Sequence, residues 1–314
     1  MKCTDFIFQG KDGKSLQGYR WSGKDSVEPK AIIQISHGMM EQGQNYEDFS
    51  HPLVEADYVV YANDHRGHGR NVKTIDELGY FAEKGGWNIA VGDMRQLTKI
   101  IQRDYPQKPI YLFGYSLGSL LVRDYITHCP QSVVGVILCG THGGIGGWNV
   151  IAMTALKWMM KWKGKKMISP FLNQLSLGNS QGLLPLSHIP IPSKPIKNIP
   201  PINSMDSVFY RQHYKISFYY DLLYGLKKVC DPKVIHAVPK DLPIYLFSGE
   251  KDPVGDHTKG VLKVYHSYLK AGMKNVYCRF YKNVGHEIYN ESNKSMVFKD
   301  LIEWLEDNAP NIKK

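Results

Sequence analysis

The chain alternates between short, nearly continuous apolar runs and segments whose apolar residues recur at helical spacing. Six apolar runs stand out, at residues 31–36, 58–64, 109–115, 133–140, 242–249 and 276–281. Runs of this kind predict strands that are buried on both faces, as in parallel sheets. Residues 89–105 carry apolar side chains at helical spacing instead. The alternation predicts an α/β fold with a doubly wound, mostly parallel sheet and helices on both faces.

Residues 4–21 form a separate pattern at the start of the chain. They read as two strands around a Lys-Asp-Gly-Lys turn, which predicts an opening hairpin. Further helices are expected at residues 46–56, 117–128, 256–271 and 292–308.

The strand and helix rhythm stops between residues 141 and 237. This stretch is rich in Pro, Trp, Met and Tyr and is expected to be mostly helical or irregular. We therefore predict a core made of residues 1–140 and 238–314, with residues 141–237 inserted as a mainly helical cap. The cap should lie over the carboxyl edge of the sheet, where open α/β sheets bind their ligands.

Composition and charge narrow the classes of partner. The 314 residues, 43% apolar and 22% charged, suit one globular core with a sizeable insertion. The net charge of +10 is spread along the chain and no nucleic-acid motif accompanies it. We expect no nucleic-acid partner, but a transient contact with an anionic lipid surface fits this charge.

The five cysteines are scattered and form no CxxC pair. This pattern argues against a disulfide framework and a thiolate metal site, and it fits a reducing compartment. The N-terminus has no long apolar stretch of the signal-peptide kind, and no run approaches the roughly 20 apolar residues of a spanning helix. A soluble, cytoplasmic protein is expected.

Ser116 lies in the motif Gly114-Tyr115-Ser116-Leu117-Gly118, between an expected strand and an expected helix. A strand that turns sharply into a helix crowds its own backbone, and the two glycines relieve this crowding. The turn presents the serine hydroxyl at a helix N-terminus, as a nucleophile requires.

A serine nucleophile needs a base and an acid, which in this architecture follow it in the order acid, then histidine. His286 follows the last expected strand, and Glu250, Asp252 and Asp256 follow the strand before it. Asp252 is favoured because a residue before proline is held extended and projects from the loop; Glu250 stays an alternative.

Backbone N–H groups should stabilise the oxyanion of the tetrahedral intermediate. One is that of Leu117, directly after the nucleophile. The other is that of Met39, in the loop after the strand at 31–36, where Gly38 allows a close approach. Each such donor contributes about 2.7–4 kcal/mol in the transition state.

Several motifs together resemble the α/β-hydrolase fold, and within it the monoacylglycerol lipase, lysophospholipase and serine aminopeptidase-like group. They read SHGMMEQGQNY, NDHRGHGRN, GYSLGS, SGEKDPVG and VGHEIYNE, in order from residue 36 to residue 291. The resemblance implies Ser116 as nucleophile, Asp252 as acid, His286 as base and the Met39 and Leu117 N–H groups as oxyanion hole. Members often carry a small residue at the position of Met40 and histidine at that of Gln42.

The likeness implies a serine hydrolase that cleaves lipid-like esters, of the monoacylglycerol or lysophospholipid type, through an acyl-enzyme. Short-chain or aryl carboxylesterases and aminopeptidase-type amide hydrolases are alternatives, since fold does not decide substrate. A non-catalytic binding protein is a further alternative, against which the intact nucleophile, acid and base positions argue.

No cofactor or metal is required by this chemistry. His65 and His68 are three residues apart, but a metal site needs further ligands, so a hydrogen-bonded structural loop is favoured. The glycines after Gly140 do not have the G-x-G-x-x-G spacing of a dinucleotide site.

The cap segment 148–166 places six apolar residues on one helical face, with Lys157 and Lys161 opposite. They are Trp148, Ile151, Ala152, Ala155, Met159 and Trp162. We expect this face to pack on the core; a lid that contacts a lipid surface, with its apolar face turned inward to the acyl pocket, is the alternative. Tyr115, Trp158 and Met159 are expected to contact the substrate.

Overall fold

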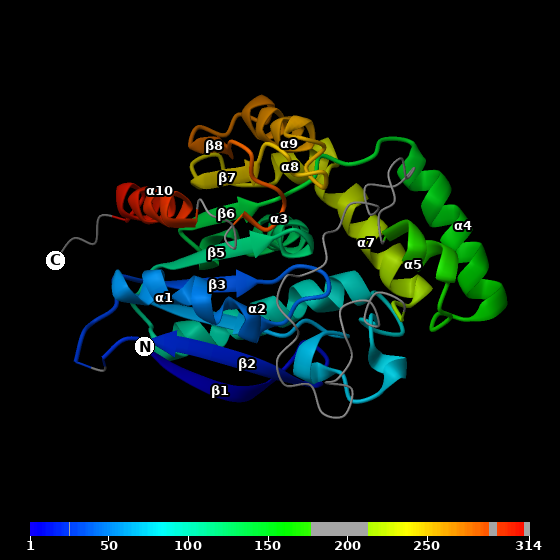
Figure 1. Ribbon diagram of the computed structural model, residues 1–314, viewed down its shortest axis with the longest axis horizontal. Helices are drawn as coiled ribbons and strands as arrows, with labels where there is room; N and C mark the ends of the chain where they lie inside the picture. The colour runs from blue at the N-terminus through cyan, green and yellow to red at the C-terminus, as the bar shows by residue number, and fades with distance from the viewer. Residues whose placement is uncertain (25, 177–212, 289–293, 311–314) are drawn as a thin grey trace.

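The computed structural model describes residues 1–24, 26–176, 213–288 and 294–310. An eight-stranded sheet runs through the molecule in the order β1-β2-β4-β3-β5-β6-β7-β8 (Figure 1). Its strands are β1 (Lys2–Gln9), β2 (Ser15–Ser22), β3 (Ala31–Ser36), β4 (Tyr58–Asn63), β5 (Ile110–Tyr115), β6 (Gly135–Cys139), β7 (Ile244–Gly249) and β8 (Val276–Tyr281).

The six strands from β3 to β8 are parallel to one another, whereas β1 and β2 form an antiparallel hairpin that joins the edge at β4. The predicted doubly wound, mostly parallel sheet and the opening hairpin are confirmed. Because the six strands share one direction, the loops after them meet at one edge of the sheet.

Helices cover both faces of the sheet. They are α1 (Glu47–Glu55), α2 (Gly86–Asp104), α3 (Leu117–His128), α9 (Lys259–Lys270) and α10 (Lys294–Asp307). Successive residues of β5 belong to opposite faces: Leu112 packs with α2, α3 and α9, whereas Tyr111 and Phe113 pack with α1 and α10. This period of two gives each strand two buried faces, which explains its nearly continuous apolar sequence.

Helix α9 begins at Lys259, three residues later than predicted. The backbones of Asp256, His257 and Thr258 all have positive φ, of 51°, 45° and 80°. These residues therefore belong to the loop that follows β7 and cannot continue a right-handed helix.

The described residues of the predicted cap form the helices α4 (Trp148–Lys163), α5 (Pro170–Ser176), α7 (Ile216–Val229) and α8 (Pro232–His236). Helices α4, α5 and α7 gather beyond one end of the sheet (Figure 1). Residues 177–212 of the predicted cap lie outside the described residues.

Helix α4 presents its apolar side chains differently from the prediction. Leu156 is buried, and Ala152, Met153, Met159 and Met160 pack beside it on the core. In contrast, Trp148, Ile151 and Trp162 of the predicted inward face are 63%, 61% and 71% exposed. The expectation that one face carrying all six residues packs on the core was wrong. Apolar residues lie on more than one face of this helix, so the sequence pattern does not decide which of them turns toward the core.

Candidate active site

Ser116 occupies the sharp turn between β5 and α3. Its φ of 51° and ψ of −115° are sparsely populated for any residue with a side chain. A Cβ at Gly118 would lie 1.9 Å from the carbonyl oxygen of Ser36, and one at Gly114 would lie 2.6 Å from the carbonyl oxygen of Gly118. Gly118 therefore lets the start of α3 pack against the end of β3, and Gly114 lets the turn close on α3. Together these contacts hold Ser116 in a strained conformation.

Asp252 and His286 face each other across the loops that follow β7 and β8. Nδ1 of His286 lies 2.9 Å from Oδ1 of Asp252, and both side chains are buried. The other carboxylate oxygen, Oδ2, accepts a hydrogen bond of 2.8 Å from the hydroxyl of Ser248, and the Val254 N–H donates to Oδ1. Glu250 and Asp256, the other carboxylates of this loop, are exposed.

Burial works against ionisation of Asp252, but its pKa is nevertheless lowered. The neighbouring imidazole of His286 and the hydrogen bond from Ser248 outweigh the desolvation of the carboxylate. Asp252 is thus ionised at neutral pH and is placed to orient the ring of His286 through Nδ1.

The ring of His286 is packed between Tyr115 and Gly140. Its centroid lies 4.9 Å from that of Tyr115. A Cβ at Gly140, whose φ is +59°, would lie 2.7 Å from Cε1 of His286. Gly140 also lines the cavity beside Ser116, so the ring of His286 packs on a residue of that cavity wall.

Ser116 opens into a cavity of about 50 Å³ beneath the cap. Among the described residues, its lining is apolar apart from Ser116 itself and one histidine. The residues are Met39, Ser116, Leu117, Leu120, Gly140, His142, Leu222, Leu223, Leu226 and Val254. Loops of the core and the first turn of α3 thus form one wall and helix α7 another, and their apolar side chains are of the kind that contacts acyl groups.

Met39 and Leu117 both line this cavity. Leu117 is the first residue of α3, so its N–H has no partner within the helix. The neighbours of Met39 are engaged, since the Gly38 N–H donates to Glu41 and the Met40 N–H donates to the hydroxyl of Tyr214. Across the described residues, no hydrogen bond uses the N–H of Met39.

Met40 has a φ of 62°, a conformation that glycine adopts more readily. The hydroxyl of Tyr214 accepts from Met40 at 2.9 Å and donates to Nε2 of His68 at 2.8 Å. Nδ1 of His68 in turn donates to the Arg66 carbonyl oxygen at 2.9 Å. This chain of bonds ties the Met39 loop to the residue that leads into α7.

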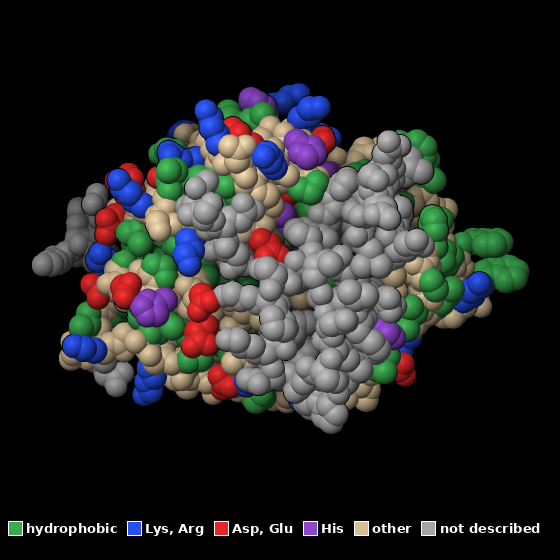
Figure 2. Space-filling view, in the orientation of Figure 1, with side chains coloured by type: hydrophobic (Ala, Val, Ile, Leu, Met, Phe, Trp, Pro, Cys, Tyr) green, Lys and Arg blue, Asp and Glu red, His purple; other side chains and the backbone are tan. Residues whose placement is uncertain are grey.

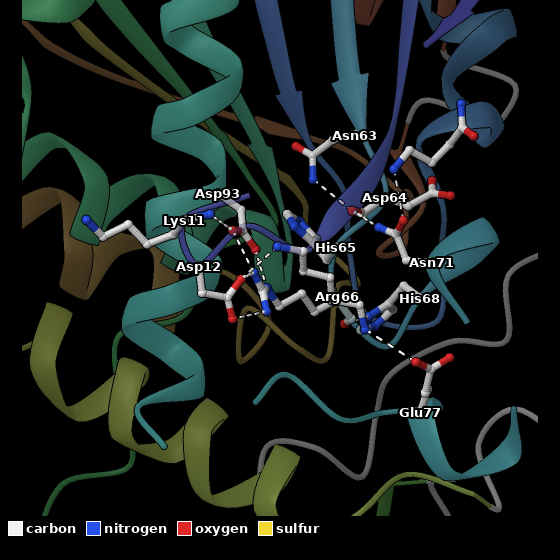
Figure 3. Close-up of polar contacts among 12 residues, drawn as sticks. Lys11, Asp12, Asn63, Asp64, His65, Arg66, His68, Asn71, Glu77 and Asp93 are labelled. Atoms are coloured by element: carbon white, nitrogen blue, oxygen red, sulfur yellow. Dashed lines mark hydrogen bonds and ion pairs between the residues drawn. The ribbon is translucent and has the colours of Figure 1, made fainter. Parts of the chain in front are cut away.

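A network of polar contacts holds the loop after β4 in place (Figure 3). Arg66 donates to Asp93 and Asp12, and Asp64 accepts from the N–H groups of Gly43 and Arg70. Burial lowers the pKa of His65 to about 3 and that of His68 to about 4, so both rings are neutral at pH 7. Within the described ranges, no group of three His, Cys, Asp or Glu side chains is arranged to hold a metal ion.

The three residues expected to contact substrate do not belong to this cavity lining. Tyr115 is buried behind His286. Trp158 is 65% exposed and stacks on Trp162 with centroids 5.0 Å apart. Met159 is half-buried and packs on the core from the side of α4.

Sequence reasoning missed His142, Val254 and the three leucines of α7. The apolar spacing of residues 216–229 could have indicated a helix with one face toward the core, since Leu222 and Leu226 are four residues apart. His142 carries no such signal, because only the path of the loop after β6 decides where its ring lies.

In the part of the chain that the structure describes, no helix combines the length and the apolarity needed to cross a bilayer.

Residues 27–293 match the family described as serine aminopeptidase, S33. The monoglyceride lipase of Homo sapiens is 26% identical over 300 residues, which cover 94% of this chain and 88% of the relative. A thermostable carboxyl esterase from Bacillus coagulans, solved in complex with glycerol, has a TM-score of 0.81 at 25% identity and covers 98% of this chain and 99% of its own.

The monoglyceride lipase of Saccharomyces cerevisiae, solved with a substrate analog, shares the fold with a TM-score of 0.70 at 15% identity, over 98% of this chain and 96% of that one. The family match covers most of the chain, and the sheet, the strained serine turn and the buried Asp252–His286 pair agree with it. The chain therefore belongs to the serine aminopeptidase S33 family of hydrolases and has the α/β-hydrolase fold.

Proposed function

We propose that this protein is a serine hydrolase that cleaves carboxylic esters of lipid-like substrates, of the monoacylglycerol or lysophospholipid type. The observation that carries the proposal is the apolar cavity into which Ser116 opens, next to the buried Asp252–His286 pair. The names of the human lipase and the Bacillus esterase support ester bonds as the target.

The reaction proceeds through an acyl-enzyme. His286 takes the proton of Ser116 as the hydroxyl attacks the ester carbonyl, while Asp252 holds the imidazole in the required tautomer. The N–H groups of Met39 and Leu117 stabilise the oxyanion. His286 then protonates the leaving alcohol and later activates the water that releases the acid.

An aminopeptidase activity is the weaker candidate. Such an enzyme needs an anionic group near the cavity to hold the α-ammonium of its substrate. Asp221 accepts the N–H of Trp87, and Asp231 caps α8 by accepting the N–H of Lys233. Both are engaged away from the cavity lining, and Asp206, the remaining acid of the predicted cap, lies outside the described residues.

We also propose that residues 141–237 act as a cap that contacts anionic lipid surfaces through the outer side of α4. Trp148, Ile151, Trp158 and Trp162 are exposed there, and hydrophobic side chains project from this end of the molecule (Figure 2). Lys161 and Lys163 of the same helix are exposed and suit anionic headgroups. The apolar residues thus face outward, opposite to the lid arrangement considered from the sequence.

A cytoplasmic location completes the proposal. All five cysteines are free thiols in the structure, which fits a reducing compartment.

Hydrolysis of a p-nitrophenyl ester series from acetyl to palmitoyl tests the function. We expect activity that rises with chain length, and a fall of up to about 10⁶-fold in kcat for Ser116→Ala. Activity confined to acetyl and butyryl esters would instead support a short-chain esterase. Activity that survives in Ser116→Ala would refute the nucleophile, and cleavage of aminoacyl amides alone would favour the peptidase.

The lipid contact is tested separately with vesicles. Trp158→Glu combined with Trp162→Glu should abolish co-sedimentation with vesicles containing phosphatidylglycerol, while activity on a soluble short-chain ester stays unchanged. Equal binding by the double variant and the parent protein would refute the contact.

A further inference from the structure

His142 is the one polar side chain besides Ser116 among the described residues that line the cavity. It lies two residues beyond Gly140 in the loop after β6 and is only 9% exposed. The remaining lining consists of leucines, Met39, Val254 and Gly140. A polar group in such a wall is costly unless it finds a partner.

The tautomer of His142 follows from its neighbours. The N–H of Gly144 donates to Nδ1 of His142 at 2.8 Å. Nδ1 is therefore the acceptor, and the ring proton is on Nε2. Burial lowers the pKa of His142 to about 4, with the charge of Arg123 adding to the effect, so the ring stays neutral at pH 7.

The Nε2–H group is left as a donor. The hydrogen bonds of His142 within the described part of the chain use its carbonyl oxygen and Nδ1, and none uses Nε2. An unused donor on a side chain that lines the cavity is a feature of a binding site, since a structural histidine normally satisfies both ring nitrogens.

The backbone that carries His142 is held firmly. Arg123, which is 2% exposed, donates to the carbonyl oxygen of His142 at 2.8 Å and to that of Val229, at the end of α7, at 3.0 Å. A Cβ at Gly143 would lie 2.6 Å from the carbonyl oxygen of Gly260 in α9. The loop is thus clamped between α7 and α9, and the ring has a defined position relative to Ser116.

We propose that the Nε2–H of His142 binds a second oxygen of the ester substrate, close to the scissile bond, and so makes the enzyme prefer oxygenated esters over hydrocarbon esters of the same size. This inference rests on the proposed function. The oxygen belongs to an ether, hydroxyl or carbonyl group, because only an acceptor pairs with the N–H donor. Sites that offer a buried donor discriminate against analogues that leave the donor unpaired.

Matched esters test the proposal on both sides of the scissile bond. The acyl pair is p-nitrophenyl 3-methoxypropanoate and p-nitrophenyl pentanoate. The alcohol pair is 2-methoxyethyl butyrate and butyl butyrate. For each pair, the ratio of kcat/KM for the oxygenated ester to kcat/KM for the hydrocarbon ester is compared between the parent protein and His142→Leu, which cancels the intrinsic reactivity of the esters.

We expect His142→Leu to lower this ratio about tenfold in one of the two pairs, and His142→Gln, which keeps a donor, to restore part of it. A drop in the acyl pair places the oxygen on the acyl group, and a drop in the alcohol pair places it on the leaving group. His266→Leu, on the exposed side of α9, is the matched control and should leave both ratios unchanged.

A thermal unfolding transition first shows that His142→Leu is folded. Unchanged kcat/KM ratios in both pairs would then overturn the inference, and so would an equal loss of kcat/KM on every ester. These outcomes differ from a failure of the proposed function, in which Ser116→Ala would retain activity on all four esters.

Discussion

Asp252, in the loop after β7, and Asp221, on helix α7, are both buried carboxylates, yet their pKa values shift in opposite directions. Burial opposes ionisation in both cases. Asp252 has the imidazole of His286 and the hydroxyl of Ser248 beside it, and its pKa is lowered. Asp221 has the N–H of Trp87 and the more distant charge of Lys165, and its pKa is raised to about 7.

Hydrogen-bonding and charged neighbours, rather than the depth of burial, therefore decide whether a buried carboxyl group is ionised. The proposed catalytic acid, Asp252, must stay ionised to orient His286, and its loop supplies the neighbours that favour the ionised form. Where α7 meets α2, the hydrogen bond from the Trp87 N–H does not offset the hydration that the Asp221 carboxylate loses on burial. Four substitutions that change these acids or their neighbours test this difference.

The largest effect is expected for Asp252→Asn. Asparagine lacks the charge that stabilises the imidazolium, and its amide can hold His286 in the wrong tautomer, so kcat should fall about 10⁴-fold. Steady-state kinetics on a p-nitrophenyl ester measure this. Glu250→Gln, an exposed carboxylate in the same loop, is the control, and a loss within tenfold for Asp252→Asn would contradict the assigned role.

Asp221→Asn should change the pH dependence of stability. Because the pKa of Asp221 is higher in the folded protein than its ordinary value of 3.8, the unfolded chain ionises first, and stability falls as the pH rises from about 4 to about 7. At about 1.4 kcal/mol per pKa unit, the upper limit of this fall is about 4 kcal/mol. Asp221→Asn has no carboxyl group at this position, so its stability should not show this fall with pH.

Urea unfolding of the parent protein and of Asp221→Asn, at several pH values between 4 and 8, measures the difference. Parallel curves for the two proteins would show that Asp221 ionises as readily in the folded state as in the unfolded chain.

Ser248→Ala removes one partner of Asp252 without touching the histidine. The lowered pKa of Asp252 stabilises the folded protein above the ordinary pKa of 3.8, and this contribution is lost as the pH falls through the folded pKa. Loss of a hydrogen bond to a carboxylate should cost about 1.5–3 kcal/mol at pH 7 and start acid unfolding at a higher pH. Denaturant titrations at pH 7 and pH 4 test both points, and Ser267→Ala on α9 is a matched control.

The smallest effect is expected for Lys165→Met. Lys165 lowers the pKa of Asp221 through its charge, but its side chain is 36% exposed and solvent screens it. Its removal should move the decline in stability to slightly higher pH and cost less than about 1 kcal/mol. Urea unfolding between pH 4 and 8 measures this shift, and Lys163→Met is the control. A change in stability as large as that of Asp221→Asn would mean that the charge of Lys165 affects Asp221 more than burial does.

The two acids differ because of neighbours that the folded chain supplies, and such neighbours cannot be predicted from local sequence. The strands and the serine turn could be predicted because they depend on local patterns. Gly114 and Gly118 flank Ser116 in any chain that makes this turn, and a parallel sheet brings the loops after β5, β7 and β8 to one edge. The positions of Ser116, Asp252 and His286 at that edge follow from chain order alone.

Other features depended on which neighbours the folded chain supplies. The apolar positions of α4 allow several rotations, and packing against α7 turned Trp148 and Trp162 outward. The start of α9 was displaced by three residues with positive φ, for which residue type gives little warning.

The sequence by itself determined the architecture, the turn at Ser116 and the order of the proposed nucleophile, acid and base, because these depend on hydrophobic period, glycine and the direction of parallel strands. Tertiary structure alone decided the cavity wall of α7, the Nε2–H of His142 that no described residue uses, and the raised pKa of Asp221. The physical reason is that burial and hydrogen bonding at these residues come from segments far away in the sequence, whose distances no local pattern contains.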